Sequence, residues 1–535
     1  MSGFLKNTFF LNALMLTDGY KIGHKFMEAS GLTKAVTNCT PRTDKRAPKG
    51  CKKVTNWGEN YVMKYIDDKF INDFFNRPKA DVCGEMKREM SLYLGVDYDV
   101  THFEALHDLQ YLPIELRTIE EGNEVPFGVP LLTISNTHKD FAWIVNYLES
   151  IFSSMSWQPI TTATIARSYH RTLTKWALKT DPENIQFVDY QGHDFSMRGM
   201  GGESSFIGSG MAHATSFIGS DTLAVIPAAR YYYNAQGTVI QSVSASEHAI
   251  MCQNMSFFIW DKYDNNWDYI GEAEFDTFKK LMTEDCPTGI LSIVCDTINT
   301  WVTIFDFMKR LKDVILTRDG KIVLRPDSSR HSPVEVISGY KGFTGHIVKT
   351  DDKGWYLPDE DAYLYRIGEY EIEYKGVVEA LWDIFGGDIT SVGYKRLNPK
   401  IGMLYGEANN NERIDRTSQN LADKGFASTN TIYGCGSVGY QLNSRDQLGL
   451  AFKMTYAEIN GHGIELFKDP ITDKGGKKSA RGLVAVFKDE AGEYYLKDRA
   501  TIEEYENSEL KLVYKDGVFI NEPQWQEVRD RIKQL

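Results

Sequence analysis

The middle of the chain repeats one pattern, in which a short apolar run ends abruptly in a charged or glycine-rich cluster. Short apolar runs separated by helical stretches are typical of buried parallel strands. Polar groups at the C-terminal ends of many such strands are typical of a β/α barrel whose site lies on that face. The pattern therefore predicts an enzyme built on a barrel. The runs are residues 187–190, 239–243, 291–295, 322–324, 401–405 and 431–433.

The length of the chain sets its expected domain organisation. With 535 residues, the chain exceeds what one hydrophobic core supports, so we expect more than one domain. The strand pattern predicts an irregular, TIM-like β/α barrel at residues 181–447, with an insertion near 339–364. Residues 1–180 and a β-rich C-terminal segment, 448–535, are predicted to pack together as an α+β domain. The expected fold class is α/β.

Local patterns in the tail, in the insertion and in the N-terminal part support this division. The tail carries short β-like runs, and its Asp516-Gly517 turn is the strongest hairpin signal in the chain. In the insertion, residues 351–354 lie between β-like runs as a hairpin turn would. Apolar residues recur with helical period at 143–157 and in one stripe near the N-terminus, which comprises Val62, Tyr65, Ile66 and Phe70.

Charge and cysteine content limit the classes of partner and the cellular compartment that we expect for this chain. The formal charge of −13 argues against a nucleic-acid or anionic-membrane surface, although it allows a local cationic pocket. Seven irregularly spaced cysteines favour reduced thiols. The chain has no apolar run long enough to span a bilayer. We therefore expect a cytoplasmic protein with no nucleic-acid and no membrane partner.

Two glycine-rich strand ends come late in the predicted barrel, at Gly406 and at 434–437. Their backbone N–H groups would lie where barrels commonly bind phosphate. Ordinary tight turns are the alternative, because glycine motifs are weakly specific. Arg445 just beyond the second loop favours phosphate binding.

The other strand ends carry charged or aromatic groups, each with a plainer interpretation. Arg325 suits a pyrophosphate oxygen and Asp327 a ribose hydroxyl or hydrated Mg²⁺, but the two could simply pair across a turn. Phe195 and Arg198 could hold a flat ring, although this segment alone favours ordinary core packing. Glu247-His248 could act as a base, a metal ligand or a nucleophile, and such a dipeptide is usually none of these. Asp221 could merely cap a helix, and Asp296, Asp327 and Glu407 could share a cation or cap helices.

Taken together and in order, these segments resemble the nicotinamide phosphoribosyltransferases, which are type II phosphoribosyltransferases. The resemblance extends from residues 14–21 to 467–470, which is most of the chain. It implies that nicotinamide and 5-phosphoribosyl 1-pyrophosphate give nicotinamide mononucleotide and pyrophosphate, a step of NAD salvage. It also implies Mg²⁺, bound through the substrate pyrophosphate with protein ligands unassigned, and ATP as a coupled co-substrate.

The resemblance also implies roles for individual residues. The pyridine ring would lie between Phe195 and Tyr20 of the partner subunit, so the active sites would be shared in a homodimer. Arg198 and Asp221 would hold the carboxamide, and ATP would phosphorylate His248. The expected catalytic residues are His248, Asp296, Asp327 and Arg325. Further substrate-binding residues are Asp18, Ser292, Gly406, Glu407, Gly436 and Ser437, and the phosphate-binding residues are Arg42, Arg445, Lys453 and Lys468.

Two alternatives remain open at this point. Nicotinate phosphoribosyltransferase is the nearer one, but Asp221 would face the nicotinate carboxylate, and buried like charges are strongly unfavourable. A non-catalytic binding protein on the same fold is the other, and it would have no need of His248. One departure from the family pattern is Gly406-Glu407-Ala408, where the family usually has Gly-Asp-Gly.

Overall fold

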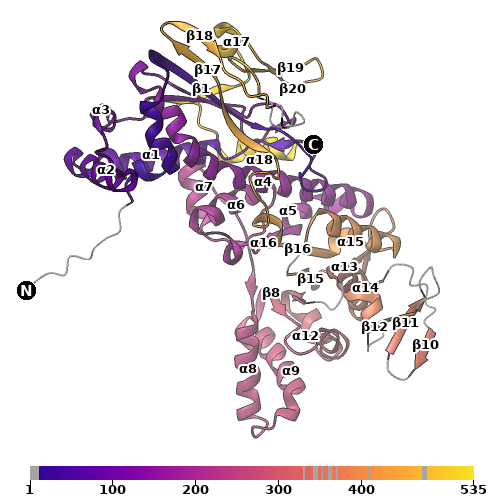
Figure 1. The fold of residues 1–535 in the computed structure, drawn as a ribbon. Helices are drawn as coiled ribbons and strands as arrows, with labels where there is room; N and C mark the ends of the chain where they lie inside the picture. Colours follow the sequence, from indigo (N-terminus) through magenta and orange to yellow (C-terminus); the bar gives the residue numbers. More distant parts are fainter. Residues whose placement is uncertain are drawn as a thin grey trace, which may run out of the picture.

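The computed structural model describes residues 11–328, 332–340, 348–351, 354–358, 364–368, 372–406, 409–470, 472 and 479–534. Two large sheets organise these residues (Figure 1). One is parallel and is built from the middle of the chain. The other is antiparallel and combines strands from both ends of the chain, drawn in indigo and yellow in Figure 1.

The parallel sheet carries the predicted strand ends. Two isolated parallel bridges, Asp194–Ser220 and Gly219–Gln241, continue the pairing beyond its first strand toward its last. The sheet therefore curls, and its C-terminal strand ends converge on one side. In the described part of the chain its spatial order is β6 (Gly192–Asp194), β16 (Thr431–Cys435), β15 (Ile401–Tyr405), β9 (Asp319–Arg325), β8 (Thr288–Val294) and β7 (Ser244–Ala245).

Most of the predicted parallel strands are confirmed, but residues 187–190 are not a strand. They continue from the 3-10 helix η5 (Pro182–Phe187) into α5 (Val188–Gln191), and β6 begins only at Gly192. A short apolar run cannot be assigned to helix or strand by periodicity alone, which is why the prediction was wrong here. The run at 239–243 contributes one bridge residue, Gln241, before β7.

Helices pack around the parallel sheet and bury one hydrophobic core with it. α8 and α9 form a hairpin that projects at the bottom of Figure 1. The helices of this core are α8 (His248–Asp261), α9 (Ile270–Lys280), α10 (Thr300–Val302), α11 (Met308–Arg310), α12 (Lys312–Thr317), α13 (Pro333–Ser338), α14 (Ile372–Phe385), α15 (Asn411–Asp423) and α16 (Ser437–Tyr440). α6 (Glu203–Ser216) and α7 (Val225–Tyr233) instead bury their apolar residues in the core that the antiparallel sheet shares.

The antiparallel sheet joins the two ends of the chain. β1 pairs along its length with β17, from Leu32 opposite Ile459 to Pro41 opposite Leu450. The predicted Asp516-Gly517 hairpin is confirmed, with Asp516 in the left-handed region at φ 51°. The spatial order is β18 (His462–Glu465), β17 (Leu450–Ile459), β1 (Leu32–Pro41), β5 (Leu132–Asn136), β3 (Ile114–Thr118), β21 (Lys511–Lys515) and β22 (Val518–Phe519).

Smaller elements complete the description. The predicted hairpin in the insertion is confirmed, because β10 and β11 pair at Asp351 and Gly354, while Asp352 and Lys353 lie outside the described residues. The small sheets are β10 (Val348–Asp351), β11 (Gly354–Pro358) and β12 (Leu364–Gly368); β13 (Gly387–Ile389) and β14 (Lys395–Leu397); β19 (Ala485–Lys488) and β20 (Tyr494–Lys497); and β2 (Val54–Thr55) and β4 (Glu124–Val125). The remaining helices are α1 (Glu59–Phe70), α2 (Lys79–Leu94), α3 (Thr101–Leu109), α17 (Ile502–Glu506) and α18 (Trp525–Lys533).

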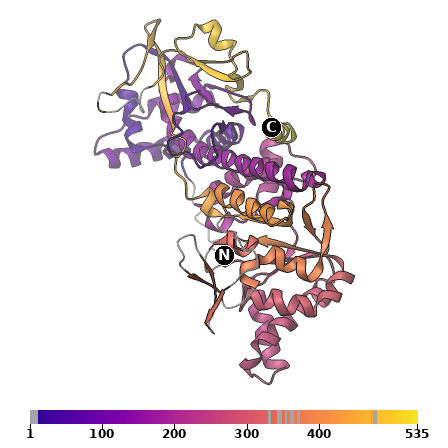
Figure 2. The same cartoon turned by 90° about the vertical axis from the view of Figure 1, so that its right-hand side faces the viewer.

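One long helix, α4 (Trp143–Thr180), runs between the two sheets (Figure 2). It contacts β1, β5 and β17 of the antiparallel sheet and α6, which shares the core of that sheet. It also contacts α15 and α16, which share the core of the parallel sheet. The helical pattern at 143–157 predicts only its beginning, because Pro159 lies in the sequence where a helix commonly ends. Here the helix continues through the proline.

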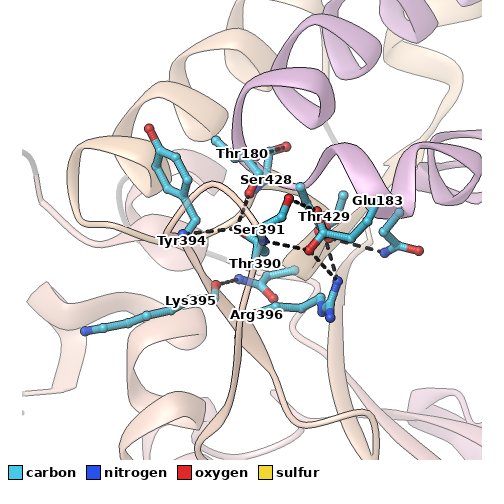
Figure 3. Close-up of polar contacts among 12 residues, drawn as sticks. Thr180, Glu183, Thr390, Ser391, Tyr394, Lys395, Arg396, Ser428 and Thr429 are labelled. Atoms are coloured by element: carbon cyan, nitrogen blue, oxygen red, sulfur yellow. Dashed lines mark hydrogen bonds and ion pairs between the residues drawn. The ribbon is translucent and has the colours of Figure 1, made fainter.

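A buried polar network fixes the C-terminal end of α4 to the β13–β14 hairpin and to the 3-10 helix η10 (Ser428–Asn430) (Figure 3). Arg396 lies 2.9 Å from the fully buried carboxylate of Asp181, which also accepts a hydrogen bond from the Thr429 hydroxyl. Ser391 donates to Glu183, and the hydroxyl of Thr390 donates to the carbonyl of residue 180. These bonds anchor the helix that leads into the parallel sheet.

Candidate active site

Two cavities adjoin at the C-terminal ends of the parallel strands. The larger, the outer pocket, has a volume of about 500 Å³ and opens to solvent. Its lining contains several residues that the sequence predicts for the site, namely Phe195, Arg198, Asp221, Arg325, Asp327 and Gly406. The smaller, the inner cavity, has a volume of about 290 Å³ and shares Phe195, Asp221 and Arg325 with it.

Asp221 presents an ionised carboxylate to the outer pocket. Its Oδ1 lies 2.9 Å from Nε2 of His193 and accepts a hydrogen bond from the Ser242 hydroxyl at 2.5 Å. Burial acts to raise the pKa of Asp221, but the hydrogen bond and charge of His193, together with Ser242 and Arg325, bring it below its ordinary value. Within the described chain Oδ2 has no hydrogen-bond partner, so it is available to a donor in the pocket.

Asp194 is hydrogen-bonded to the turn that follows Phe195 and to the turn that contains Asp221. It is fully buried at the end of β6, where its Oδ1 accepts the backbone N–H of Ser196 at 2.9 Å. Its Oδ2 accepts the Thr222 hydroxyl at 2.8 Å, and its carbonyl accepts the backbone N–H of Asp221 at 3.0 Å. A buried carboxylate with several donors is stable and rigid. Phe195 and Asp221 are thereby held close to the same strand end, where both line the two cavities.

Arg325 is fixed at the end of β9 by its neighbours on β7 and β8. Its Nη2 donates to the carbonyl of Ser246 at 2.6 Å, and its guanidinium lies 5.9 Å from the Phe195 ring centroid. Ser246 is in turn held by β8, because its backbone N–H donates to the carbonyl of Ser292 and its hydroxyl accepts the N–H of Val294. The cation therefore faces the pocket in a defined orientation.

Asp327 and Gly406 approach each other across the ends of β9 and β15. A Cβ atom on Gly406 would lie 1.8 Å from Oδ1 of Asp327, so any side chain at this position would displace the carboxylate. No hydrogen bond or ion pair of the Asp327 carboxylate is present among the described residues. Glu407, the next predicted site residue, lies outside the described residues, as does Ala408.

His248 is the first residue of α8, and its ring is bound by Asp296. Its Nε2 lies 3.1 Å from Oδ1 of Asp296, and the Ser328 hydroxyl donates to the other oxygen at 2.6 Å. The His248 side chain is 48% exposed, so its Nδ1 edge remains accessible. Asp296, and not the neighbouring Glu247, is therefore the carboxylate that orients the ring.

The late glycine loop lies beside the turn that carries Arg198. Gly436 precedes the first turn of α16, and Ser437 begins that helix. α16 packs against the 3-10 helix η6 (Met197–Gly199), which contains Arg198. Ser292 lies elsewhere: it is buried on β8, lines the inner cavity and does not reach the outer pocket lining.

Six predicted site residues form a second group, away from these cavities. None of them lines the outer pocket or the inner cavity, and within the described chain none is hydrogen-bonded or ion-paired to a lining residue. Asp18 and Tyr20 lie together at the start of the 3-10 helix η2 (Gly19–Phe26), with the Tyr20 side chain 66% exposed. The group comprises Asp18, Tyr20, Arg42, Arg445, Lys453 and Lys468.

The cations of this second group concentrate positive charge around β17. Burial lowers the pKa of Lys453, Glu149 opposes that effect, and the nearby charges of Arg42, Lys468 and Arg445 lower it further. Like charges held this close favour an anion between them. This group is therefore a second candidate phosphate site, remote from the strand ends in one chain.

Sequence reasoning missed the residues that position the site. Ser242 and Ser246 are isolated serines that carry no distinctive signal, and no role was predicted for Asp194, although it directly precedes Phe195. Among the described residues, no group of three or more His, Cys, Asp or Glu side chains is arranged to hold a metal ion. No helix in this part of the chain combines the length and hydropathy of a membrane span.

Comparisons with known proteins identify the family of the chain. The model of the nicotinate phosphoribosyltransferase (NAPRTase) family matches residues 190–516. A nicotinamide phosphoribosyltransferase of Acinetobacter baylyi is 38% identical over 98% of this chain and 98% of its own. One of Mycoplasma pneumoniae is 28% identical, covering 89% of this chain and 97% of its own. The crystal structure of human nicotinic acid phosphoribosyltransferase shares the fold with a TM-score of 0.53 at 14% identity, over 97% of this chain and 93% of its own. The chain belongs to the nicotinate phosphoribosyltransferase family.

Proposed function

We propose that this protein is an enzyme of NAD salvage that transfers phosphoribose from 5-phosphoribosyl 1-pyrophosphate to nicotinamide, releasing pyrophosphate and nicotinamide mononucleotide. The observation that carries this proposal is the ionised Asp221 carboxylate, which faces the outer pocket beside the ring of Phe195. Relatives named for the same activity support it over the whole chain.

Asp221 favours nicotinamide over nicotinate. Its free oxygen accepts a hydrogen bond from the amide NH₂ of nicotinamide, whereas nicotinate would bring a second carboxylate to the same position. A charge-assisted hydrogen bond contributes about 1.5–3 kcal/mol, which corresponds to roughly ten- to a hundredfold discrimination. Phe195 stacks on the ring and Arg198, which lines the same pocket, holds the carboxamide oxygen.

Departure of pyrophosphate requires negative charge to be stabilised at the strand ends. Arg325 faces that region with its guanidinium fixed by Ser246, and Asp327 has an unoccupied carboxylate beside Gly406. A carboxylate of this kind fits a ribose hydroxyl or the hydration shell of Mg²⁺, which the substrate pyrophosphate would carry. When bound, Mg²⁺ supplies further charge neutralisation on the leaving group. The backbone N–H groups around Gly436 and Ser437 hold the 5′-phosphate.

His248 accepts a phosphoryl group from ATP in this proposal, and the coupled hydrolysis drives the transfer. Because Nε2 faces Asp296, the ring donates its proton there and keeps the lone pair on the accessible Nδ1. A phosphate on this nitrogen lies at the N-terminus of α8, where the helix dipole stabilises negative charge. Asp296 therefore both orients the ring and fixes its tautomer.

The two separate groups of site residues support a homodimer with shared active sites. In one chain, Tyr20 and the four cations around β17 do not reach the outer pocket. A second subunit that placed its Tyr20 over Phe195 would close the ring site and bring its Arg42, Arg445, Lys453 and Lys468 to the substrate phosphates. Asp18 would position that tyrosine, to which it is already hydrogen-bonded.

The finer architecture and the location in the cell are part of this proposal. The parallel sheet and its two bridges support an irregular, TIM-like β/α barrel at residues 181–447. The antiparallel sheet supports a second domain built from residues 1–180 and 448–535. Seven free cysteines support a reducing, cytoplasmic location.

The decisive experiment supplies purified protein with 5-phosphoribosyl 1-pyrophosphate, Mg²⁺ and either nicotinamide or nicotinate, with and without ATP. We expect mononucleotide from nicotinamide, increased by ATP, and a ten- to hundredfold lower preference in Asp221→Asn. Preference for nicotinate would overturn the substrate, and an unchanged preference in the variant would overturn the role of Asp221. Absence of turnover by folded protein would favour a binding function.

Subunit complementation tests the shared site. Tyr20→Ala and Arg325→Ala would each be inactive alone, because each removes one half of every site. After mixing through reversible dissociation, mixed dimers contain one intact site, so we expect up to about a quarter of wild-type activity to return from random pairing. Mixed dimers that form without any recovered activity would show that each chain completes its own site.

A further inference from the structure

The proposed reaction requires two halves of the active site to stay at a fixed separation. In the proposed function, the carboxamide half is the turn at residues 219–222, which carries Asp221, and the phosphate half is the loop at Gly436 and Ser437. The ring nitrogen must meet the anomeric carbon in line with the departing pyrophosphate, and a misplacement of about 1 Å can lower the rate about a hundredfold. A contact that fixes this separation therefore contributes to the rate.

His213, in the last turn of α6, is hydrogen-bonded to both halves. Its side chain is fully buried, and its Nε2 lies 2.9 Å from the carbonyl oxygen of Gly219, two residues before Asp221. Its Nδ1 lies 2.7 Å from the hydroxyl of Tyr440, the last residue of α16. His213 lines neither the outer pocket nor the inner cavity, so any effect on the substrates passes through these two partners.

The two partners fix the tautomer of the His213 ring. A backbone carbonyl can only accept a hydrogen bond, so Nε2 carries the proton and Nδ1 keeps its lone pair. The hydroxyl of Tyr440 therefore donates to Nδ1. Burial lowers the pKa of His213 in spite of the opposing charge of Asp194, and the neutral ring satisfies both hydrogen bonds at once.

The carbonyl of Gly219 is a junction within the carboxamide half. It also accepts the backbone N–H of Asp194 at 3.1 Å, and the carbonyl of Asp194 accepts the N–H of Asp221 at 3.0 Å. A Cβ atom on Gly219 would lie 2.9 Å from Nδ1 of His193, whose Nε2 binds the carboxylate of Asp221. A shift of the Gly219 carbonyl would therefore reach that carboxylate through both Asp194 and His193.

Tyr440 connects His213 to the phosphate half. α16 has only four residues, so Tyr440 lies about one helical turn from Ser437 at its start. The Tyr440 side chain is fully buried, and its ring packs edge to face on His213 with ring centroids 5.8 Å apart. Given the proposed function, on which this role depends, we propose that His213 is a positioning residue that sets the separation between the carboxamide half and the phosphate half.

Calorimetric titration with nicotinamide mononucleotide, nicotinamide and ribose 5-phosphate tests this role without turnover. The mononucleotide spans both halves, whereas each fragment occupies one half and does not depend on their separation. Tyr440→Phe removes the hydrogen bond to Nδ1 of His213 and keeps the aromatic ring. We expect its fold loss of mononucleotide affinity to exceed the product of its fold losses for the two fragments by about two- to tenfold.

Two further variants separate this role from general packing. His213→Gln keeps an N–H donor near Nε2 but removes the acceptor for Tyr440, so it should reproduce the excess loss. Combining it with Tyr440→Phe should add little, because both changes remove the same hydrogen bond. Tyr505→Phe is the matched control, since it removes another buried tyrosine hydroxyl, 2.9 Å from that of Thr133, and should show no excess loss.

The outcomes distinguish this role from the proposed function. Wild-type binding of the mononucleotide, with variant losses no greater than the product of the fragment losses, would overturn the role of His213 alone. An equal excess loss in Tyr505→Phe would overturn it too, because any missing buried hydroxyl would then have the same effect. A folded wild-type protein that does not bind the mononucleotide would overturn the proposed function and the role of His213 with it.

Discussion

The effect of burial on the pKa of Glu274 can be measured as a change of stability with pH. It lies on α9 with only 2% of its surface exposed, and its Oε1 has no hydrogen-bond partner among the described residues. Burial raises its pKa, the backbone hydrogen bond of Ile298 opposes that effect and the charge of Asp296 adds to it, and together they place the pKa at about 7. Glu274 is therefore largely protonated in the folded protein below neutral pH.

Replacing Glu274 by glutamine removes this titration and keeps the shape. Below the ordinary pKa of 4.5, the carboxyl group holds its proton in both the folded and the unfolded state, so its titration does not change the free energy of unfolding. As the pH rises toward the folded pKa of about 7, only the unfolded chain releases its proton, and stability is lost. At about 1.4 kcal/mol per pH unit, the penalty reaches about 3 kcal/mol above pH 7.

Urea unfolding of the wild-type protein and Glu274→Gln at pH 5 and pH 8 measures this penalty. The variant should gain about 2–3 kcal/mol relative to wild type between these two pH values, whatever constant offset the amide introduces. Glu490→Gln, at an exposed turn, is the control and should show no such trend. A difference between wild type and Glu274→Gln that stays constant from pH 5 to pH 8 would refute the reasoning.

Three other substitutions probe contacts described above. Gly406→Ala places a methyl group 1.8 Å from Asp327, so kcat/KM should fall about a hundredfold without loss of thermal stability, and unchanged kinetics would contradict this. Arg396→Met leaves the buried Asp181 without its cation and should lower the free energy of unfolding, measured in denaturant, by about 3 kcal/mol. If the two residues act as a pair, adding Asp181→Asn to this variant should make the loss smaller, and an equal or larger loss would contradict the pairing. His193→Ala should raise the KM for nicotinamide more than that for the phosphoribosyl donor, and equal changes would argue for a general structural defect.

The fold was predictable where apolar runs are long or end in unmistakable turns. Residues 401–405 coincide with β15, and the Asp516-Gly517 hairpin follows from local backbone preference. The run at 187–190 failed because a few apolar residues fit a helical turn as well as a strand. The full length of α4 was hidden by Pro159, whose helical setting depends on tertiary packing that the sequence does not display.

The sequence predicted several of the residues that line the outer pocket, but not the contacts that hold them in place. Motifs identified Phe195, Asp221 and Arg325, because ring stacking and phosphate binding require distinctive side chains. The serines that fix Arg325 and Asp221 escaped notice, since a hydroxyl becomes functional only through the partner that folding brings to it.

The pairing of β1 with β17 has a consequence for how the chain is made. At about 5–20 residues per second, the ribosome needs roughly 20–80 seconds after completing β1 to deliver the strand that lies beside it. Throughout that interval one edge of β1 is unpaired, and an open strand edge invites pairing with other chains. Nascent molecules of this protein therefore carry an uncovered strand edge for most of their synthesis, and translation that halts before residue 450 leaves β1 without the strand that covers it.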